Sequence, residues 1–521
     1  MKTDFYWVKI LYSRKTILIR CFYKILPLSL KKIGEIENTE KNFFPYKFVN
    51  EKTLDYVGPP PEKIFWETNA FLIFNGVFCL KDEIINYCLK NIKFILVILQ
   101  KLSKIFLAEC GDILKKNFST PSISHYAFFK VYNSKSVPQF LSKKNDLYVR
   151  NAFFGGRSEV FGNPYTWENV KYYDFSGMYG QVMRECFHNG EGVYSVPTDF
   201  YSPGFYTVTF CSKNMQIPIL PRHSETGKLL FANGAGIGTY WFEELQYFLQ
   251  QGGEIKKIHH AFIYPKFEII FANFVDNFSN LRKRKGVYDI FGKLVINSFY
   301  GSTALKDDNT TIFISYSEEE VESLIKNLNI VKYLRVNNAM LLIIELDQKY
   351  KNFFGYLSSN NAKRNISIAT AITSKARIKL HKFFTEIEKD GGRLLYCDTD
   401  SAFAGYSKLN LSLLINNKEW LNVYERCVFA APKSYALLDK VQGLTIRIKG
   451  VQSDKINFEE FENAFYTSSR LAVNEVGYTS KHDFILEKKT ETRVLDFSSY
   501  DKRVFSPDKK KTSPLIINTP L

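Results

Sequence analysis

Two aspartates separated by one residue follow an apolar run in the stretch YCDTDSAF, residues 396–403 of this 521-residue chain. The apolar lead-in predicts a buried strand, and the Thr-Asp-Ser that follows it suits a turn. Because side chains alternate along a strand, Asp398 and Asp400 would point to the same side of the strand end. Close carboxylates repel each other unless a cation lies between them, and Mg²⁺ prefers such oxygen ligands. The pattern predicts either a magnesium site or a solvated Asp-X-Asp loop, which is the commoner outcome.

Length and composition describe a large folded protein with a basic surface. The length corresponds to roughly three to four domains, and 45% hydrophobic with 16% aromatic residues excludes general disorder. A net charge of +17 indicates a polyanionic partner, nucleic acid before membrane. AT-rich coding, which favours Lys, Asn, Ile and Phe, explains the same charge equally well.

Cysteine spacing and apolar runs exclude two further classes of protein. The eight cysteines form no CxxC pair and no even framework, so we expect free thiols in a reducing compartment. No apolar run reaches the 18 residues of a membrane span, so we expect no membrane partner. The first 20 residues are basic and aromatic, which leaves targeting open.

A third aspartate lies in YYDFSGMYGQVM, residues 172–183. Asp174 ends an apolar run, and Ser176 and Gly177 follow it, which predicts a strand-to-helix turn with a carboxylate at its mouth. Taken alone, an ordinary helix N-cap is the favoured interpretation of this aspartate.

The stretch GKLVINSFYGS, residues 292–302, predicts a helix with one polar face. Lys293, Asn297 and Tyr300 fall at i, i+4 and i+7 and therefore share that face. A cation, an amide and a phenol in one line suit a nucleoside triphosphate, whereas an ordinary surface helix is the alternative.

The three stretches together favour a catalytic metal site over a solvated loop. Asp174 and Asp400 on adjacent strand ends could hold two metal ions roughly 3.5–4 Å apart, the arrangement of two-metal phosphoryl transfer. Lys293 would neutralise charge on the transferred group.

At these residues the chain resembles family B DNA polymerases of the protein-primed branch, found in bacteriophages and linear mitochondrial plasmids. The family's motifs A, B and C have their counterparts here, in the same order, in DFSGMYG (174–180), KLVINSFYG (293–301) and YCDTDS (396–401). The resemblance covers roughly residues 80–470.

Three shorter segments extend the resemblance. FFGGR at 153–157 is similar to the family's YxGG segment, PKSY at 432–435 to its KxY motif, and RIKGV at 447–451 to the start of its thumb.

The resemblance implies a role for each matching residue. Two Mg²⁺ ions would be held by Asp174 and Asp400, with Asp398 as the third catalytic aspartate. Tyr179 would act as a steric gate against a 2′-hydroxyl. The incoming deoxynucleotide would be bound by Tyr179, Lys293, Asn297 and Tyr300. DNA would be bound by Gly155, Gly156, Arg157, Lys433 and Tyr435.

The implied fold class is α+β: a right-hand polymerase with a palm of mixed sheet, helical fingers and a small thumb, after a partial, degenerate ribonuclease H-like exonuclease domain. The expected domains are the partial exonuclease domain (1–150), palm with the first protein-priming insertion (151–265), fingers (266–310), second insertion (311–365), palm with the catalytic aspartates (366–440), thumb (441–505) and a flexible tail (506–521).

The chain departs from the family pattern in four places. Motif A has Gly177-Met178-Tyr179-Gly180 where the family has Ser-Leu-Tyr-Pro, and Phe153 replaces a tyrosine. No first or second exonuclease motif is found before residue 80, which predicts an N-terminally truncated chain. Asn91 occupies the position of the aspartate in the third motif, and an amide cannot supply that charge. We therefore expect no proofreading.

The leading functional hypothesis is a DNA-directed DNA polymerase that acts as a monomer on a DNA template-primer with deoxynucleotides. A terminal protein is an alternative primer, and a mitochondrial location follows from the resemblance and the composition. One alternative is a decayed, plasmid-derived remnant that binds nucleic acid without catalysis. The other is a reverse transcriptase-like enzyme, which shares the paired aspartates but does not predict the Lys293 helix.

Overall fold

The computed structural model of the chain forms two compact units. Unit 1 comprises Met1–Lys135 and Phe271–Ser302, and unit 2 comprises Ser136–Ile270 and Thr303–Leu521. The expected fingers therefore group with the N-terminal residues rather than with the segments on either side of them. The described residues are 7–12, 15–38, 44–50, 52–66, 76–109, 119–129, 138–139, 141–305, 310–315, 317–327, 329–336, 339–345, 364–407, 418–439, 443–451, 456–480 and 486–518.

Unit 1 is mainly helical. Phe128 packs against Phe271, Phe274 and Phe299, and the Ser124 hydroxyl donates to the Val295 carbonyl at 2.7 Å. No helix among the described residues is both long and apolar enough to span a bilayer. The helices are α1 (Leu30–Ile36), α2 (Leu80–Glu109), α4 (Thr120–Ala127), α8 (Ala272–Arg282) and α9 (Val287–Ala304). The strand pairs are β1–β2 (Trp7–Tyr12, Lys15–Arg20) and β3–β4 (Val57–Gly58, Phe78–Cys79). The partial exonuclease domain stays a prediction.

The centre of unit 2 is a five-stranded sheet in the order β20-β6-β19-β18-β5. All its pairs are antiparallel, so the expected mixed sheet is wrong. The turn of two residues between β18 and β19 accounts for part of this, because only antiparallel strands can be joined so tightly. The strands are β5 (Ser158–Val160), β6 (Asn169–Phe175), β18 (Arg393–Asp398), β19 (Ser401–Tyr406) and β20 (Lys418–Tyr424).

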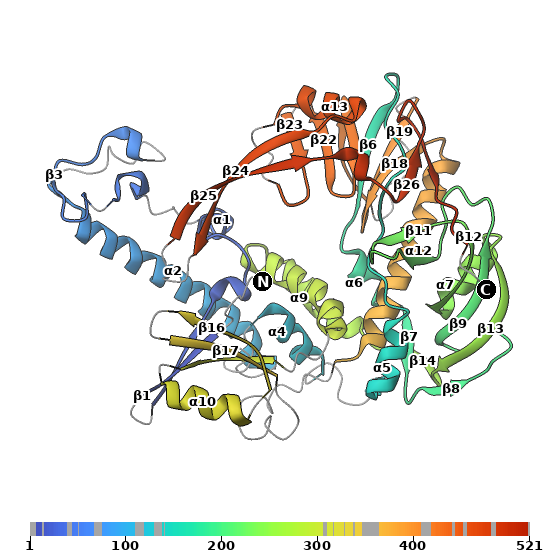
Figure 1. Cartoon of the computed structure of the whole chain (residues 1–521), viewed down its shortest axis with the longest axis horizontal. Helices are drawn as coiled ribbons and strands as arrows, with labels where there is room; N and C mark the ends of the chain where they lie inside the picture. Colours follow the sequence, from blue (N-terminus) through green and yellow to red (C-terminus); the bar gives the residue numbers. More distant parts are fainter. Residues whose placement is uncertain are drawn as a thin grey trace. The chain divides into compact units, whose positions relative to one another are not determined.

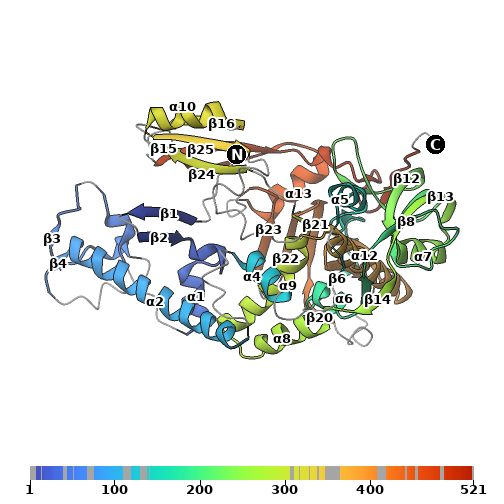
Figure 2. The same cartoon turned by 90° about the horizontal axis from the view of Figure 1, so that it is seen from below.

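A long buried helix, α12 (Ile366–Lys389), packs against this sheet and against three other helices (Figures 1 and 2). The Asn365 side chain caps its first turn by accepting from the Ser367 amide. Phe383 packs edge-on against Tyr173 and Phe175 of β6. The three helices are α5 (Lys143–Arg150), α6 (Met178–Val182) and α7 (Phe242–Gln250).

Two further sheets occupy the segments where insertions are expected. The first has the order β12-β9-β13-β8 and contacts α7, and the second has the order β15-β17-β16 and contacts α10. Their identity as protein-priming insertions stays a prediction. The elements of the first region are β7 (Cys186–Asn189), β8 (Val193–Ser195), β9 (Gly204–Ser212), β10 (Pro221–His223), β11 (Leu229–Phe231), β12 (Gly234–Trp241), β13 (Glu254–Ile263) and β14 (Lys266–Ile269). Those of the second are β15 (Thr310–Ser315), α10 (Glu318–Asn327), β16 (Asn329–Val336) and β17 (Ala339–Glu345).

The expected thumb shares one hydrophobic core with the strands before it. Val428 and Ala436 are buried in the same cluster as Ile446, Phe461 and Phe465. The core therefore extends back past the expected boundary at residue 440. The elements are β21 (Arg426–Ala431), β22 (Ser434–Asp439), β23 (Gly443–Arg447), α13 (Phe458–Thr467), β24 (Leu471–Ser480) and β25 (Leu486–Leu495).

The tail expected to be flexible is held in place through residue 518. Strands β26 (Arg503–Phe505) and β27 (Thr512–Pro514) form a hairpin, and Ile516 bridges to Asn233. The polar composition of the tail led to the prediction of flexibility. The order of these residues could not be predicted from the segment itself because their hydrogen-bond partners lie hundreds of residues away in the sequence.

Candidate functional site

The three predicted aspartates gather at one end of the central sheet. Asp174 of β6 is the register partner of Ser401 in β19, and the Phe175 amide donates to the Asp400 carbonyl at 2.9 Å. Asp398 ends β18 and pairs with the same Ser401. Residues more than 200 positions apart in the sequence thus become neighbours.

The turn between Asp398 and Asp400 has an uncommon backbone. Thr399 has φ +63°, and a β-branched residue is rare in this left-handed region. Such a conformation costs about 1–3 kcal/mol and persists only where neighbours enforce it. Here the Thr399 amide donates to the Arg157 carbonyl at 2.7 Å, and the Asp400 amide donates to the Asp398 carbonyl at 2.7 Å.

The segment Gly155-Gly156-Arg157, predicted to bind DNA, supports this turn. A Cβ on Gly156 would lie 2.8 Å from Cγ2 of Thr399, whereas one on Gly155 would meet nothing within 4 Å. Arg157 is 2% exposed, and its guanidinium forms an ion pair with Glu159. The guanidinium of Arg157 is therefore turned into the protein rather than toward a DNA strand.

Lys433 and Tyr435 lie on the other side of Asp398. The Lys433 ammonium is 2.9 Å from the Asp398 carboxylate, and the Lys433 amide donates to the Tyr396 hydroxyl at 2.8 Å. Tyr435 packs against Tyr396 in the same cluster. One of the three carboxylates is thus engaged by a cation of the chain itself.

Tyr172 contributes to the site but was missed in the sequence. Burial, together with the smaller effects of the negative charges of Asp174 and Asp400, raises its pKa to about 12. Both carboxylates therefore act on one phenol, as expected for neighbours in a cluster. The alternation of strand side chains could have indicated it, because Tyr172 lies two residues before Asp174.

The donor set fits Mg²⁺ that is shared with a substrate. Among the described residues, no cluster of three or more His, Cys, Asp or Glu side chains could hold a metal ion. Magnesium in nucleotide sites is usually bound by one or two carboxylates together with substrate phosphates. Asp174 and Asp400 can supply these two carboxylates, while Asp398 is paired with Lys433.

The remaining predicted residues lie on two helices. Tyr179 is 6% exposed on α6, which begins after Gly177 at φ +67°. On α9 of unit 1, Lys293 is exposed, and Asn297 and Tyr300 are half-buried, as is Leu294. The apolar side chains of Val295, Ile296 and Phe299 are buried. The helix has the predicted polar face, and its contact with a nucleotide stays a prediction.

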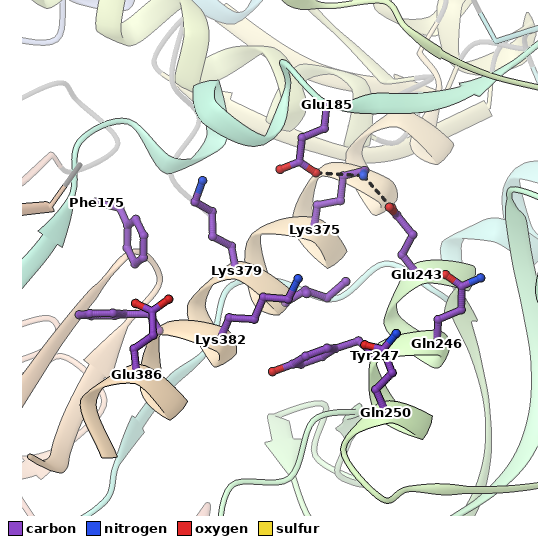
Figure 3. A pocket seen from close by; sticks show the side chains of 12 residues that line it. Phe175, Glu185, Glu243, Gln246, Tyr247, Gln250, Lys375, Lys379, Lys382 and Glu386 are labelled. Carbon is purple, nitrogen blue, oxygen red and sulfur yellow. Dashed lines mark hydrogen bonds and ion pairs between the residues drawn. The ribbon is translucent and has the colours of Figure 1, made fainter. Parts of the chain in front are cut away.

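A cavity of about 450 Å³ lies between α7 and α12 (Figure 3). Phe175 lines it, so it lies on the side of β6 opposite to Asp174. Lys375 lies between Glu185 and Glu243, at 3.1 and 2.7 Å. The charges of three lysines and three glutamates in this lining cancel. The lining contains none of the predicted site residues. The cavity is therefore separate from the predicted nucleotide site.

Two buried histidines make stability depend on pH. Burial lowers the pKa of His381 to about 4, with a further contribution from Arg157, and lowers that of His188 to about 3. Both remain neutral in the folded chain while the unfolded chain binds protons below about pH 6.5.

We expect the free energy of unfolding to decrease as the pH falls from 6.5 towards 4, by up to about 1.4 kcal/mol per pH unit for each histidine. His381→Gln, whose amide can still donate to the Ile217 carbonyl, should show a shallower decrease. Urea unfolding between pH 7.5 and 4.5 measures this, and equal slopes in both proteins would contradict it.

A profile of the family described as "DNA polymerase type B, organellar and viral" matches residues 1–389. The match covers well over half of the chain and includes Asp174 and the whole of α9. The chain belongs to this family. Asp398 and Asp400 lie beyond the matched residues, so their assignment rests on the geometry above.

The names of relatives that match the chain by sequence agree with this family. A "Probable DNA polymerase" of Podospora anserina is 23% identical over 541 residues, covering 92% of this chain and 43% of the relative. One of Agaricus bitorquis is 24% identical, covering 86% of this chain and 61% of the relative. The "DNA-directed DNA polymerase" of Enterobacteria phage PRD1 is 24% identical, covering 62% and 53%. The chain spans about half the length of the curated relatives it matches.

Among solved structures, the chain is similar to Phi29 DNA polymerase in its complex with primer-template DNA and incoming nucleotides. The TM-score is 0.66 at 16% identity, covering 95% of this chain and 83% of that chain. This likeness shows an α+β fold shared over most of the chain.

Proposed function

We propose that the chain is a DNA-directed DNA polymerase that adds deoxynucleotides to a 3′-hydroxyl by two-metal-ion phosphoryl transfer. The observation that supports this most is the placement of Asp174 beside Asp400, with the Phe175 amide 2.9 Å from the Asp400 carbonyl, in a chain of this family. Two carboxylates on neighbouring strand ends match what metal-assisted transfer needs from a protein.

Each predicted residue has a part in this proposal. Bound Mg²⁺ would lower the pKa of the attacking hydroxyl and stabilise the leaving pyrophosphate. Asp174 and Asp400 would hold the ions, and the Lys433 ammonium would keep Asp398 oriented beside them. Tyr179 would exclude a 2′-hydroxyl by steric contact. The triphosphate, sugar and base would be bound by Lys293, Asn297 and Tyr300.

The proposed partner is a DNA template-primer, the kind of DNA bound in the similar Phi29 complex. Lys433 and Tyr435 would lie along the primer strand, whereas Gly156, which was also predicted there, would make room for Thr399 of the turn. A terminal-protein hydroxyl is the alternative primer, with the two inserted sheets as its proposed contacts. The family's description as organellar supports a mitochondrial location, and we propose a monomer.

Primer extension by the purified chain tests the proposal. We expect Mg²⁺-dependent extension on a DNA template, lost on addition of EDTA, and little extension on an RNA template. Preferred use of RNA would favour a reverse transcriptase. Binding of DNA without any incorporation would favour the remnant.

We also propose that this chain does not proofread, because Asn91 on α2 lies where the family's third exonuclease motif has an aspartate. With a labelled primer that ends in a mismatch, we expect no release of the terminal nucleotide. Asn91→Asp is the matched variant. Excision by the unmodified chain would contradict the proposal, and excision only after Asn91→Asp would identify the missing carboxylate as the cause.

A further inference from the structure

Three consecutive backbone carbonyls at Gln216, Ile217 and Pro218 accept hydrogen bonds from three buried side chains. The distances are 3.0 Å from Nη2 of Arg503 to Gln216, 2.9 Å between Nε2 of His381 and Ile217, and 2.7 Å from Nη1 of Arg157 to Pro218. These donors come from β26, from α12 and from the segment before β5. Residues 216–218, which belong to the region where the first insertion is expected, are thus hydrogen-bonded to three distant parts of unit 2.

All three donors are removed from water. Arg157 and Arg503 are each 2% exposed, and His381 is 8% exposed. The lowered pKa of His381 keeps its ring neutral, and the Tyr247 hydroxyl lies 2.9 Å from its other nitrogen. Since solvent offers them little competition, these contacts are stronger than the same contacts on a surface.

Glu159 provides the negative charge in this region. Its Oε2 accepts from both Nε and Nη2 of Arg157, at 2.8 and 2.6 Å, and the residue is fully buried. Burial lowers the pKa of Lys502 and of Arg503, and the negative charge of Glu159 opposes this shift in both. A buried charge is tolerated only when it is paired, so the geometry of this group is narrowly defined.

This buried group contacts the catalytic turn directly. The carbonyl of Arg157 accepts the Thr399 amide at 2.7 Å, and Glu159 is the register partner of Cys397 on β18. The Lys502 ammonium donates to the Ser158 carbonyl at 3.1 Å. A displacement of the Arg157 backbone would therefore move the turn that carries Asp398 and Asp400.

We propose that Arg157 and Glu159 are positioning residues that hold this turn in place, and that the carbonyls of 216–218 connect the first inserted region to it. We call the set of Arg157, Glu159, residues 216–218 and Arg503 the buried clamp. The consequence for catalysis rests on the proposed polymerase function. The placement of the aspartates for a divalent cation does not depend on that function.

Glu159→Gln tests the clamp, because it keeps the shape of the side chain and leaves the Arg157 cation unpaired. We expect the affinity for Mn²⁺, measured from the free-ion signal in electron paramagnetic resonance, to fall about 10-fold or more. In primer extension, kcat should fall by a similar factor while KM for the deoxynucleotide stays within about twofold. Circular dichroism reports whether the variant folds.

Glu243→Gln is the matched control. It changes a carboxylate whose partners, Lys375 on α12 and the Trp241 indole, are not members of the clamp. We expect Mn²⁺ affinity and kcat within about twofold of the unmodified chain.

If Glu159→Gln does not fold, the double variant Arg157→Met/Glu159→Leu takes its place. It removes both members of the Arg157–Glu159 ion pair, so neither is left buried alone, and it loses the bond to Pro218, so we expect the same loss of Mn²⁺ affinity. The buried Arg503 cation remains and loses the nearby charge of Glu159. A folded double variant with unchanged Mn²⁺ affinity and kcat would overturn the clamp.

An unmodified chain that binds Mn²⁺ without extending primers would count against the polymerase alone, because the Mn²⁺ comparison still decides the clamp. An unmodified chain that binds Mn²⁺ no better than Asp400→Asn would overturn both.

Discussion

Asp400→Asn is expected to lower primer extension by about 10³-fold or more, equivalent to about 4 kcal/mol of transition-state stabilisation. The amide keeps the size of the side chain and can hydrogen-bond in its place, but it carries no charge for a divalent cation. Because Asp400 lies beside Asp174 at the sheet end, its loss leaves one of the two proposed ligands. Single-turnover extension at saturating DNA and deoxynucleotide measures the effect.

Substitutions of two further aspartates provide the comparison for this result. Asp398→Asn should have a smaller effect, about 10-fold, because that carboxylate pairs with Lys433 rather than acting as a proposed metal ligand. Asp501→Asn, which changes a half-exposed carboxylate of the same unit, should leave extension unchanged. DNA affinity should be retained in all three. Extension by Asp400→Asn at the rate of the unmodified chain would show that the site lies elsewhere.

Local patterns predicted the site as far as it depends on single elements. The alternation in YCDTD and YYD indicated strand ends with carboxylates. Asp174 is the penultimate residue of β6, Asp398 ends β18, and Asp400 lies in the turn that follows. The 3.6-residue spacing in GKLVINSFYG indicated one polar face, and Val295 and Phe299 are indeed buried on the other. These outcomes follow from the periodicity of strands and helices, which needs no knowledge of the fold.

The features that the sequence did not indicate depend on partners that are distant in the sequence. Arg157 was assigned to DNA because FFGGR is similar to the family's YxGG segment, whereas its guanidinium is buried against Glu159 and Pro218. The tail (506–521) was expected to be flexible, whereas the Thr512 hydroxyl accepts from Arg503 and donates to the Val160 carbonyl. No periodicity in a single segment reports such contacts.

Gly156→Ala is expected to reduce extension by about 10- to 100-fold, through packing rather than through DNA. The new Cβ would lie 2.8 Å from Cγ2 of Thr399, closer than real contacts allow, so the turn must move. Displacements of about 1 Å in an active site cost about 100-fold in rate. Thr399 is already in an unfavourable conformation and has little freedom to adjust.

Gly155→Ala is the matched control, because its Cβ would meet nothing within 4 Å. If the two glycines serve mainly to let a DNA strand approach, both substitutions should weaken DNA binding to a similar degree. If Gly156 instead makes room for the turn, only Gly156→Ala should reduce kcat, with DNA affinity unchanged. Adding Thr399→Ser to Gly156→Ala removes the crowded methyl group and should restore part of the rate. Equal loss in both glycine variants, without rescue by Thr399→Ser, would assign the segment to DNA contact.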